Sequence, residues 1–308
     1  NNHKSIISLV PEYGLEKEKE QKEADKLAEY KSTLTNDELE ELVKKTKELK
    51  EYQDTPSSQE DLEKIPMLEL SDIKREPAKD YNDVKSVDGI KIVHHNIFTN
   101  KIAYINMSFD TKCVPDELIP YMGLLGSTLS LMDTKNYTYP ELTNEININC
   151  GGLATGTALY SDKVDFSKNT IVYEVKSKAL YEKVPFVLGM MEEIMYNTRF
   201  DDYKRLKEII ARIKSRLEAS LMGQGHSIAM LECCAQFSES AYYSDILRGY
   251  KYYEFIKKLD EEFEQNKTQI VDKLNKLVGY IFNKDNVIVY KGYTDNNGMI
   301  VIDDLLYG

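Results

Sequence analysis

Cysteine and histidine are scarce in this chain, and their spacing excludes several kinds of site. Its 308 residues contain four cysteines without the spacing of a zinc site, namely Cys113, Cys150, Cys233 and Cys234. No histidine has a second candidate ligand three or four residues away, as a zinc site on a helix requires; the four are His3, His94, His95 and His226. We therefore predict no metal site here, and reduced cysteines in the core or at its boundary.

The chain also lacks excess positive charge and long apolar runs. Lys and Arg number 40 against 52 Asp and Glu, which gives a net charge of -12. Nucleic acid requires a concentrated cationic surface, so peptides or proteins are the better-matched partners. No run approaches the roughly 18 apolar residues of a membrane span, and the start "NNHKS" is not that of a signal peptide. We expect no membrane partner and a cytoplasmic location, with an organelle matrix as the alternative.

Two charged helices are predicted near the start of the sequence. Residues 15–34 carry a thin apolar stripe, and a Thr-x-x-Glu capping box at 35–38 begins a second helix with apolar residues three and four apart. The pair predicts an antiparallel helical hairpin, which with the start of its linker occupies residues 15–66. Residues from about 53 to 86 are polar and proline-punctuated, which predicts a linker around one short extended piece, Met67–Leu70.

The remainder, residues 67–294, predicts an α+β domain. Alternating apolar residues indicate two consecutive strands in 89–111, a strand hairpin in 153–178 and a closing strand at 286–293. Helical spacing occurs at 118–132, 139–149, 181–198, 201–221, 224–240, 249–264 and 267–281. This order indicates a largely antiparallel sheet covered by helices.

The two ends of the sequence contain segments that are predicted to belong to neighbouring domains. Ile6–Val10 is apolar and strand-like, but no neighbouring segment offers a partner, so residues 1–14 are predicted to be the last strand of a preceding domain. Residues 295–308 are predicted to begin a connection to a following domain. Unpaired apolar pieces of this kind favour association, so self-association is expected.

Other residues of chemical interest receive structural interpretations. Adjacent His94 and His95 point to opposite faces of a strand, which excludes a shared metal. The segment Gly223–His226 lacks the phosphate-loop pattern and indicates a helix break. Glu192, Glu193 and Glu208 lie on predicted helices without an acid–base partner and are interpreted as solvated charges. No catalytic or metal-binding residue is assigned, and the residues of any binding site remain unidentified at this stage.

Several segments together resemble a known family. They are the helical pair, the exit "IPMLELSDIKRE", the strand pair "GIKIVHHNIFTNKIAYINMSFDT", the run "LIPYMGLLGSTLSLMDTKNYTYPEL" and the helix start "FDDYKRLKEIIARIKSRLEA". This arrangement is similar to the connecting hairpin and third domain of the pitrilysin/insulinase family of zinc metallopeptidases, in its presequence-protease branch. The resemblance spans nearly the whole chain.

In that family, four homologous α+β domains form two halves joined by a helical hairpin, and a His-x-x-Glu-His helix in the first domain holds zinc. Aligning residues 133–137 with the turn after the zinc helix places the motif on Leu124, Leu125, Gly126, Ser127 and Thr128. Neither imidazole nor the general-base carboxylate is present there, and no histidine occurs between residues 96 and 225.

The resemblance therefore implies a noncatalytic segment of a zinc peptidase. Its partners would be the remaining domains of the parent enzyme and an unfolded peptide enclosed between the halves, with zinc and catalytic residues supplied elsewhere. This segment would form chamber wall and connecting hinge. One alternative is an inactive stand-alone subunit partnered with a separate catalytic chain, against which the partnerless strand argues. The other is a peptide- or protein-binding module built on the acidic hairpin, which the thin apolar stripe makes a weak candidate.

Overall fold

The computed structural model describes residues 10–292 except 11, 77–81, 163 and 166. The chain divides into two units, one up to Pro77 and one from Ala78 onward. The predicted strand at 6–10 and the predicted connection at 295–308 lie outside the described residues, apart from Val10, which is exposed.

The first unit is a series of exposed helices, α1 (Leu15–Thr33), α2 (Asn36–Asp54) and the short α3 (Gln59–Glu63). The predicted capping box is present at the start of α2. The Glu38 amide donates to the Thr35 hydroxyl at 3.3 Å, and the Thr35 amide donates to the Glu38 carboxylate at 2.8 Å. These bonds satisfy two amides that a helix start otherwise leaves unpaired.

The antiparallel packing predicted for this helical pair is wrong. Neither helix buries a residue, and Leu27 and Leu42, which belong to the apolar stripes of the two helices, are 61% and 50% exposed. Only Leu34 and Leu39, on either side of the turn, are half-buried among the described residues of the pair. The physical reason is the narrow apolar stripe, since helices of this length draw most of their stability from burying a broad face.

The described part of the second unit contains one six-stranded sheet in the order β1-β2-β6-β3-β5-β4. Its strands are β1 (Asn82–Val87), β2 (Ile90–His95), β3 (Ile102–Asp110), β4 (Leu153–Ser161), β5 (Asn169–Leu180) and β6 (Val287–Gly292). All neighbouring pairs are antiparallel except β2 with β6. The α+β class and largely antiparallel sheet predicted from the sequence are confirmed.

Two features of the sheet differ from the prediction. The linker predicted for residues from about 53 to 86 contains most of β1, whose side chains are almost all exposed, so that its composition is polar for a strand. The consecutive strands β2 and β3 do not pair, because β6 lies between them. Sequence periodicity identifies strands but does not encode this insertion of a distant segment.

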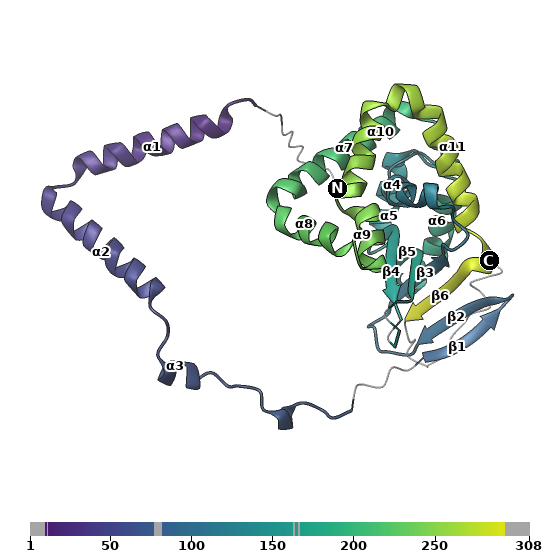
Figure 1. Cartoon of the computed structure of the whole chain (residues 1–308), viewed down its shortest axis with the longest axis horizontal. Coiled ribbons are helices and arrows are strands. Elements are labelled where there is room, and N and C mark those ends of the chain that lie inside the picture. The colour runs from purple at the N-terminus through teal and green to yellow at the C-terminus, as the bar shows by residue number, and fades with distance from the viewer. Residues whose placement is uncertain (1–9, 11, 77–81, 163, 166, 293–308) are drawn as a thin grey trace. The chain divides into compact units, whose positions relative to one another are not determined.

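Eight described helices of the second unit accompany the sheet, most of them gathered on one side of β3, β5 and β4 (Figure 1). They are α4 (Ile119–Thr128), α5 (Tyr139–Asn149), α6 (Val184–Tyr196), α7 (Tyr203–Gly223), α8 (Gly225–Cys234), α9 (Glu239–Arg248), α10 (Tyr250–Glu261) and α11 (Phe263–Ile281). The separate helix α9 was not predicted. Among the described helices, none is both long and apolar enough to cross a membrane.

The core lies between the helices and one face of the sheet. Alternate residues of β3 and β5, such as Phe109 and Tyr173, are buried and stand opposite each other across the two strands. Phe282, which follows α11, meets both rings edge to face at 5.1 and 5.6 Å between centroids. This packing fixes the register of the sheet and turns every second side chain to its opposite face.

Candidate functional site

The opposite face of the sheet carries polar and aromatic side chains, and we call it the open face. Strand alternation and register place on it the residues Tyr104, Asn106, Ser108 and Asp110 of β3, Tyr160 of β4, Glu174, Lys176 and Lys178 of β5, Tyr290 of β6 and His95 of β2. Tyr104 and Tyr160 are about half exposed, at 48% and 53%. The open face therefore presents chemical groups instead of continuing the core.

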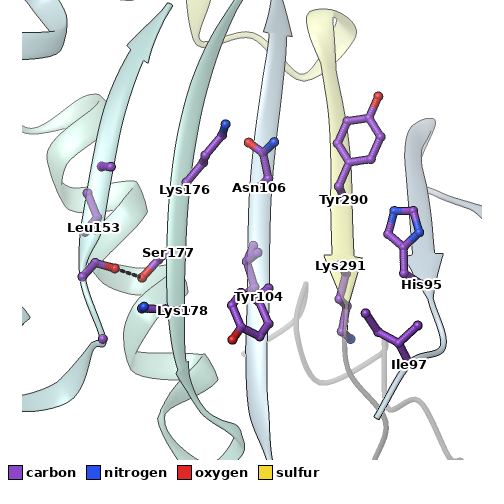
Figure 2. A pocket seen from close by; sticks show the side chains of 14 residues that line it. His95, Ile97, Tyr104, Asn106, Leu153, Lys176, Ser177, Lys178, Tyr290 and Lys291 are labelled. Atoms are coloured by element: carbon purple, nitrogen blue, oxygen red, sulfur yellow. Dashed lines mark hydrogen bonds between the residues drawn. The ribbon is translucent and has the colours of Figure 1, made fainter. Parts of the chain in front are cut away.

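A shallow pocket of about 620 Å³ extends across this face. Side chains from five strands line it, including Asn106, Lys176, Tyr290 and His95, which stand beside one another on adjacent strands (Figure 2). The His95 and Tyr290 rings lie nearly parallel, at 9° with centroids 6.5 Å apart. Gly151 and Gly152 also line the pocket, so their backbone forms part of its surface.

A second hollow of about 520 Å³ adjoins the first along β3 and β6. Asn106 and Tyr290 line both, and the second adds Ser108, Asp110 and Tyr160. The open face is thus hollowed over much of its length, which suits an extended ligand better than a compact one.

A buried carboxylate organises the polar side chains of the open face. Glu174 is 5% exposed. Its Oε1 accepts hydrogen bonds from Asn106 at 2.9 Å, Tyr160 at 3.0 Å and Ser108 at 3.4 Å. Its Oε2 is paired with the Lys176 ammonium at 2.6 Å. Residues from three strands are thereby held in one network.

The network keeps Glu174 charged. Burial acts to raise its pKa, but the Lys176 ammonium and the hydrogen bonds from Asn106 and Tyr160 outweigh burial and hold the pKa below its ordinary value. Burial, together with the bond to Glu174, raises the pKa of the Tyr160 phenol. With both oxygens occupied, Glu174 is a positioning group and not a free general base.

The structure separates the two adjacent histidines as predicted. His95 is half-buried on the open face, whereas His94 is 1% exposed on the core face, in register with Lys291. Burial, together with the charge of Lys291, lowers the pKa of His94. His226 is exposed in α8, and the predicted helix break falls at Gln224, between α7 and α8. His3 lies outside the described residues.

Helix α4 does not offer a zinc site at the positions aligned with the zinc motif. Leu124 and Leu125 are fully buried in the core, and the Thr128 hydroxyl donates to the Leu125 carbonyl at 3.0 Å. Gly126 packs so closely on β4 that an added Cβ would lie 3.1 Å from the Gly156 Cα. Within the described part of the chain, no group of three or more His, Cys, Asp or Glu side chains is placed to hold a metal ion. The residues present do not fit a zinc ion.

One of the three glutamates interpreted as solvated is buried instead. Glu193 is 6% exposed and accepts from the Asn136 amide at 3.0 Å, from the Asn136 side chain at 2.8 Å and from the Asn197 side chain at 2.7 Å. It holds the turn that follows α4, so its role is structural. Glu192 and Glu208 are exposed, and Glu208 pairs with Arg205 at 3.4 Å.

The cysteine prediction is corrected in part. All four cysteines are free, but Cys113 and Cys233 are exposed, and Cys150 and Cys234 are half-buried. Cys113 donates a hydrogen bond to the Tyr280 carbonyl at 3.2 Å, which a surface position allows. The spacing of the cysteines in the sequence does not show how deeply each of these small side chains is buried.

Sequence reasoning did not single out the Glu174 network. The alternation of β3 indicates that Asn106 and Ser108 share a polar face, but the partner strand and its register determine that both meet Glu174, 66 to 68 residues later. The available signal was Glu174 itself, a charged residue among the apolar residues of the strand 169–180. Because charged side chains are rarely buried without a partner, a glutamate at this position indicates a paired carboxylate.

Comparison with known proteins agrees with this architecture. The family model that matches residues 9–259 describes regions associated with subfamily C of the M16 peptidases. Protein HypA of Clostridium perfringens is 38% identical over 293 residues, which cover 95% of this chain and 30% of that protein. Presequence protease 1, chloroplastic/mitochondrial, of Arabidopsis thaliana is 30% identical over 269 residues, covering 86% of this chain and 25% of that protein.

The mitochondrial presequence protease of Drosophila melanogaster is 25% identical over 287 residues, covering 93% of this chain and 27% of that protein. This chain thus spans less than a third of the length of these relatives. A crystal structure of a conserved protein from Enterococcus faecalis V583 matches 73% of this chain and 52% of its own, with a TM-score of 0.52 and 12% identity, and supports the fold alone. The resemblance to presequence proteases is confirmed, and this chain belongs to the family of regions associated with subfamily C of the M16 peptidases.

Proposed function

We propose that this chain is a noncatalytic segment of a zinc-dependent peptidase that degrades unfolded peptides. The remaining domains of the parent enzyme would hold the zinc and perform the hydrolysis. Support comes from the family and from α4, whose Leu124 and Thr128 are occupied in packing and backbone bonding. A helix without nitrogen ligands or a general base offers no means to bind or activate water on a metal.

The open face is the part of this chain that would contact the peptide as the wall of an enclosing chamber. The single observation that carries this proposal is the hollowed surface of about 620 Å³ that crosses five strands, opposite the helix-covered face. Its exposed Tyr104 and Lys178 combine aromatic and polar contact without a deep, shape-selective cavity. Such a surface suits extended chains of varied sequence.

The helices α1 and α2 would form the connecting hinge between the halves of the parent. Their support is their exposure, because helices that bury nothing within this chain gain stability by packing elsewhere or remain weakly held. Opening and closing of two halves around such a connector would admit peptide and exclude solvent.

The parent would act in the cytoplasm. The four free cysteines agree with a reducing compartment. The names of the plant and insect relatives place those proteins in organelles, so an organelle matrix is the alternative.

Peptide binding to the open face can be measured on this chain. We expect an unstructured peptide to bind the purified chain weakly, and Tyr104→Ser to weaken that binding several-fold, because the exposed ring supplies contact area. Phe237→Ser, at an 82% exposed position between α8 and α9, is the matched control and should leave binding unchanged. Equal binding by all three proteins would remove the open face from the proposal.

A further inference from the structure

A separate pocket of about 650 Å³ lies where α4 runs beside the edge strand β4. Its floor contains small residues, because Gly126 approaches Gly156 of β4 and Gly123 approaches the ring of Tyr252, which an added Cβ would meet at 2.8 Å. Hydroxyls of Ser127 and Thr157 also line it. These short side chains leave the space that the pocket occupies.

Three arginines border this pocket. Arg212 and Arg216 are four residues apart on α7 and so share one face of that helix, while Arg248 is the last residue of α9. Within the described ranges, none of the three forms an ion pair, and no Asp or Glu lines the pocket. The absence of local carboxylates is notable in a chain with 52 Asp and Glu against 40 Lys and Arg.

A buried phenol also lines the pocket, near one of the arginines. Tyr252 is 5% exposed, and no described residue hydrogen-bonds its hydroxyl. Burial raises the pKa of this phenol, and the nearby Arg216 acts in the opposite direction. A negatively charged occupant would therefore enter a region of positive potential with a polar floor.

We propose that this pocket binds a carboxylate carried by a peptide. Guanidinium groups present planar donor pairs that match the two oxygens of a carboxylate. The acidic remainder of the chain would repel a long polyanion but would leave one small anionic group unopposed in the pocket. The choice of a peptide as the carrier rests on the proposed function, whereas the anion site rests on the arginines alone.

Titration calorimetry on the 308-residue chain tests the site with three short unstructured peptides of the same length. The first has one internal Asp and an amidated C-terminus, the second replaces that Asp by Asn, and the third has Asn with a free C-terminal carboxylate. We expect the second peptide, which carries no carboxylate, to bind at least about tenfold more weakly than one of the other two. Comparing the first with the third identifies a side-chain or a terminal carboxylate as the ligand.

Charge variants connect the preference to the pocket. Arg212→Gln with Arg216→Gln should abolish the preference for a carboxylate, and Arg212→Lys with Arg216→Lys should restore it in part, since charge returns without the planar donors. Lys204→Gln with Lys257→Gln removes the same charge from exposed positions outside the pocket and should keep the preference.

An unchanged preference in the Arg-to-Gln variant would overturn the inference, as would equal binding of all three peptides. Binding of inorganic phosphate without discrimination among the peptides would overturn the peptide carboxylate as ligand. We call the pocket bordered by the three arginines the arginine pocket. If Tyr104→Ser weakens binding of every peptide and the arginine variants do not, the proposed function stands while the arginine pocket is rejected as a binding site.

Discussion

Thr155 donates its hydroxyl hydrogen to the Gly126 carbonyl oxygen, 3.0 Å away, and so ties the edge strand β4 to helix α4. The two backbones approach closely at this point, because Gly126 faces Gly156. The relationship fixes the wall of the arginine pocket and seats α4 on the core.

Gly126→Ala should therefore destabilise the protein. The new Cβ would lie 3.1 Å from the Gly156 Cα and 3.3 Å from the Thr155 carbonyl oxygen, both backbone atoms with little freedom to move. We expect the free energy of unfolding to fall by about 1–3 kcal/mol, as for overpacked cores. Chemical denaturation monitored by circular dichroism measures the change.

The matched control is Gly189→Ala, in the middle of α6, where an added Cβ meets nothing within 4 Å. Alanine there should stabilise the protein by about 0.5–1 kcal/mol through helix propensity. A Gly126→Ala variant as stable as this control would contradict the close approach of α4 to β4.

Glu174→Gln should lower the free energy of unfolding and reduce the dependence of that free energy on acidic pH. Removing the charge disrupts the pair with Lys176 and the bonds from Asn106 and Tyr160, a loss of about 1–3 kcal/mol at pH 7. Because the folded-state pKa of Glu174 is lowered, its contribution is present above the unfolded value of about 4.3 and is lost as pH falls through the folded value. Denaturation at pH 7 and pH 3 should show the wild type and variant converging in acid; a constant difference would rule out the network.

Lys291 should make the folded protein more stable as the pH becomes alkaline. Burial, with repulsion from Lys85, lowers its pKa to about 8. The unfolded chain binds this proton up to about pH 10.4, so stability attributable to Lys291 increases between about pH 8 and that value. Lys291→Met should remove this component of the rise, whereas Lys91→Met, at an exposed position of the neighbouring strand, should not. Unfolding curves between about pH 7.5 and pH 10.5, each compared with wild type, provide the measurement.

The isolated chain is expected to bind no zinc stoichiometrically and to cleave no peptide. The reason is chemical, since Leu124, Ser127 and Thr128 replace the ligands and base expected from the resemblance. Metal analysis after dialysis against zinc gives the answer. One tightly held zinc per chain, or cleavage that a chelator stops, would contradict both this prediction and the noncatalytic assignment.

Leu27→Asp with Leu42→Asp tests the proposed hinge. Both side chains are largely exposed, so within this chain the unfolding free energy should change by less than about 0.5 kcal/mol. In the longer parent enzyme, peptide turnover should fall while zinc content stays constant, because the apolar surface of the connector is lost. Lys44→Gln with Lys47→Gln, at exposed positions of α2, makes the net charge more negative by the same amount without removing apolar surface, and so controls for charge. Unaltered turnover in the leucine variant would reject the hinge.

Local signals in the sequence predicted most elements of this fold. The alternation in β3 and the capping box before α2 act over a few residues, so both could be identified without tertiary information. The helical pair shows the limit of such signals, since correct spacing of apolar residues indicated a face but not whether that face is buried. Strand β1 shows the converse, because an exposed edge strand carries little of the apolar pattern that prediction relies on.

The candidate site depends on contacts that no local pattern contains. Glu174 meets Asn106 and Tyr160 because the β3–β5 and β4–β5 registers place them together. Arg212 and Arg248 reach one pocket because α7 and α9 both lie beside α4. Register and helix packing are tertiary properties, so the residue types were visible in the sequence while their meeting was not.

The position of β6 affects how the chain is made as well as its final form. Residues 287–292 leave the ribosome after the other described strands of the sheet, yet they sit between β2 and β3 and pair with both. Until then the β1–β2 hairpin and the β3–β5–β4 strands each present an open edge, and open edges recruit other chains. A chain that ended before Val287 would lack β6, so β2 and β3 would each keep the unpaired edge that β6 covers, and such edges favour pairing with other chains.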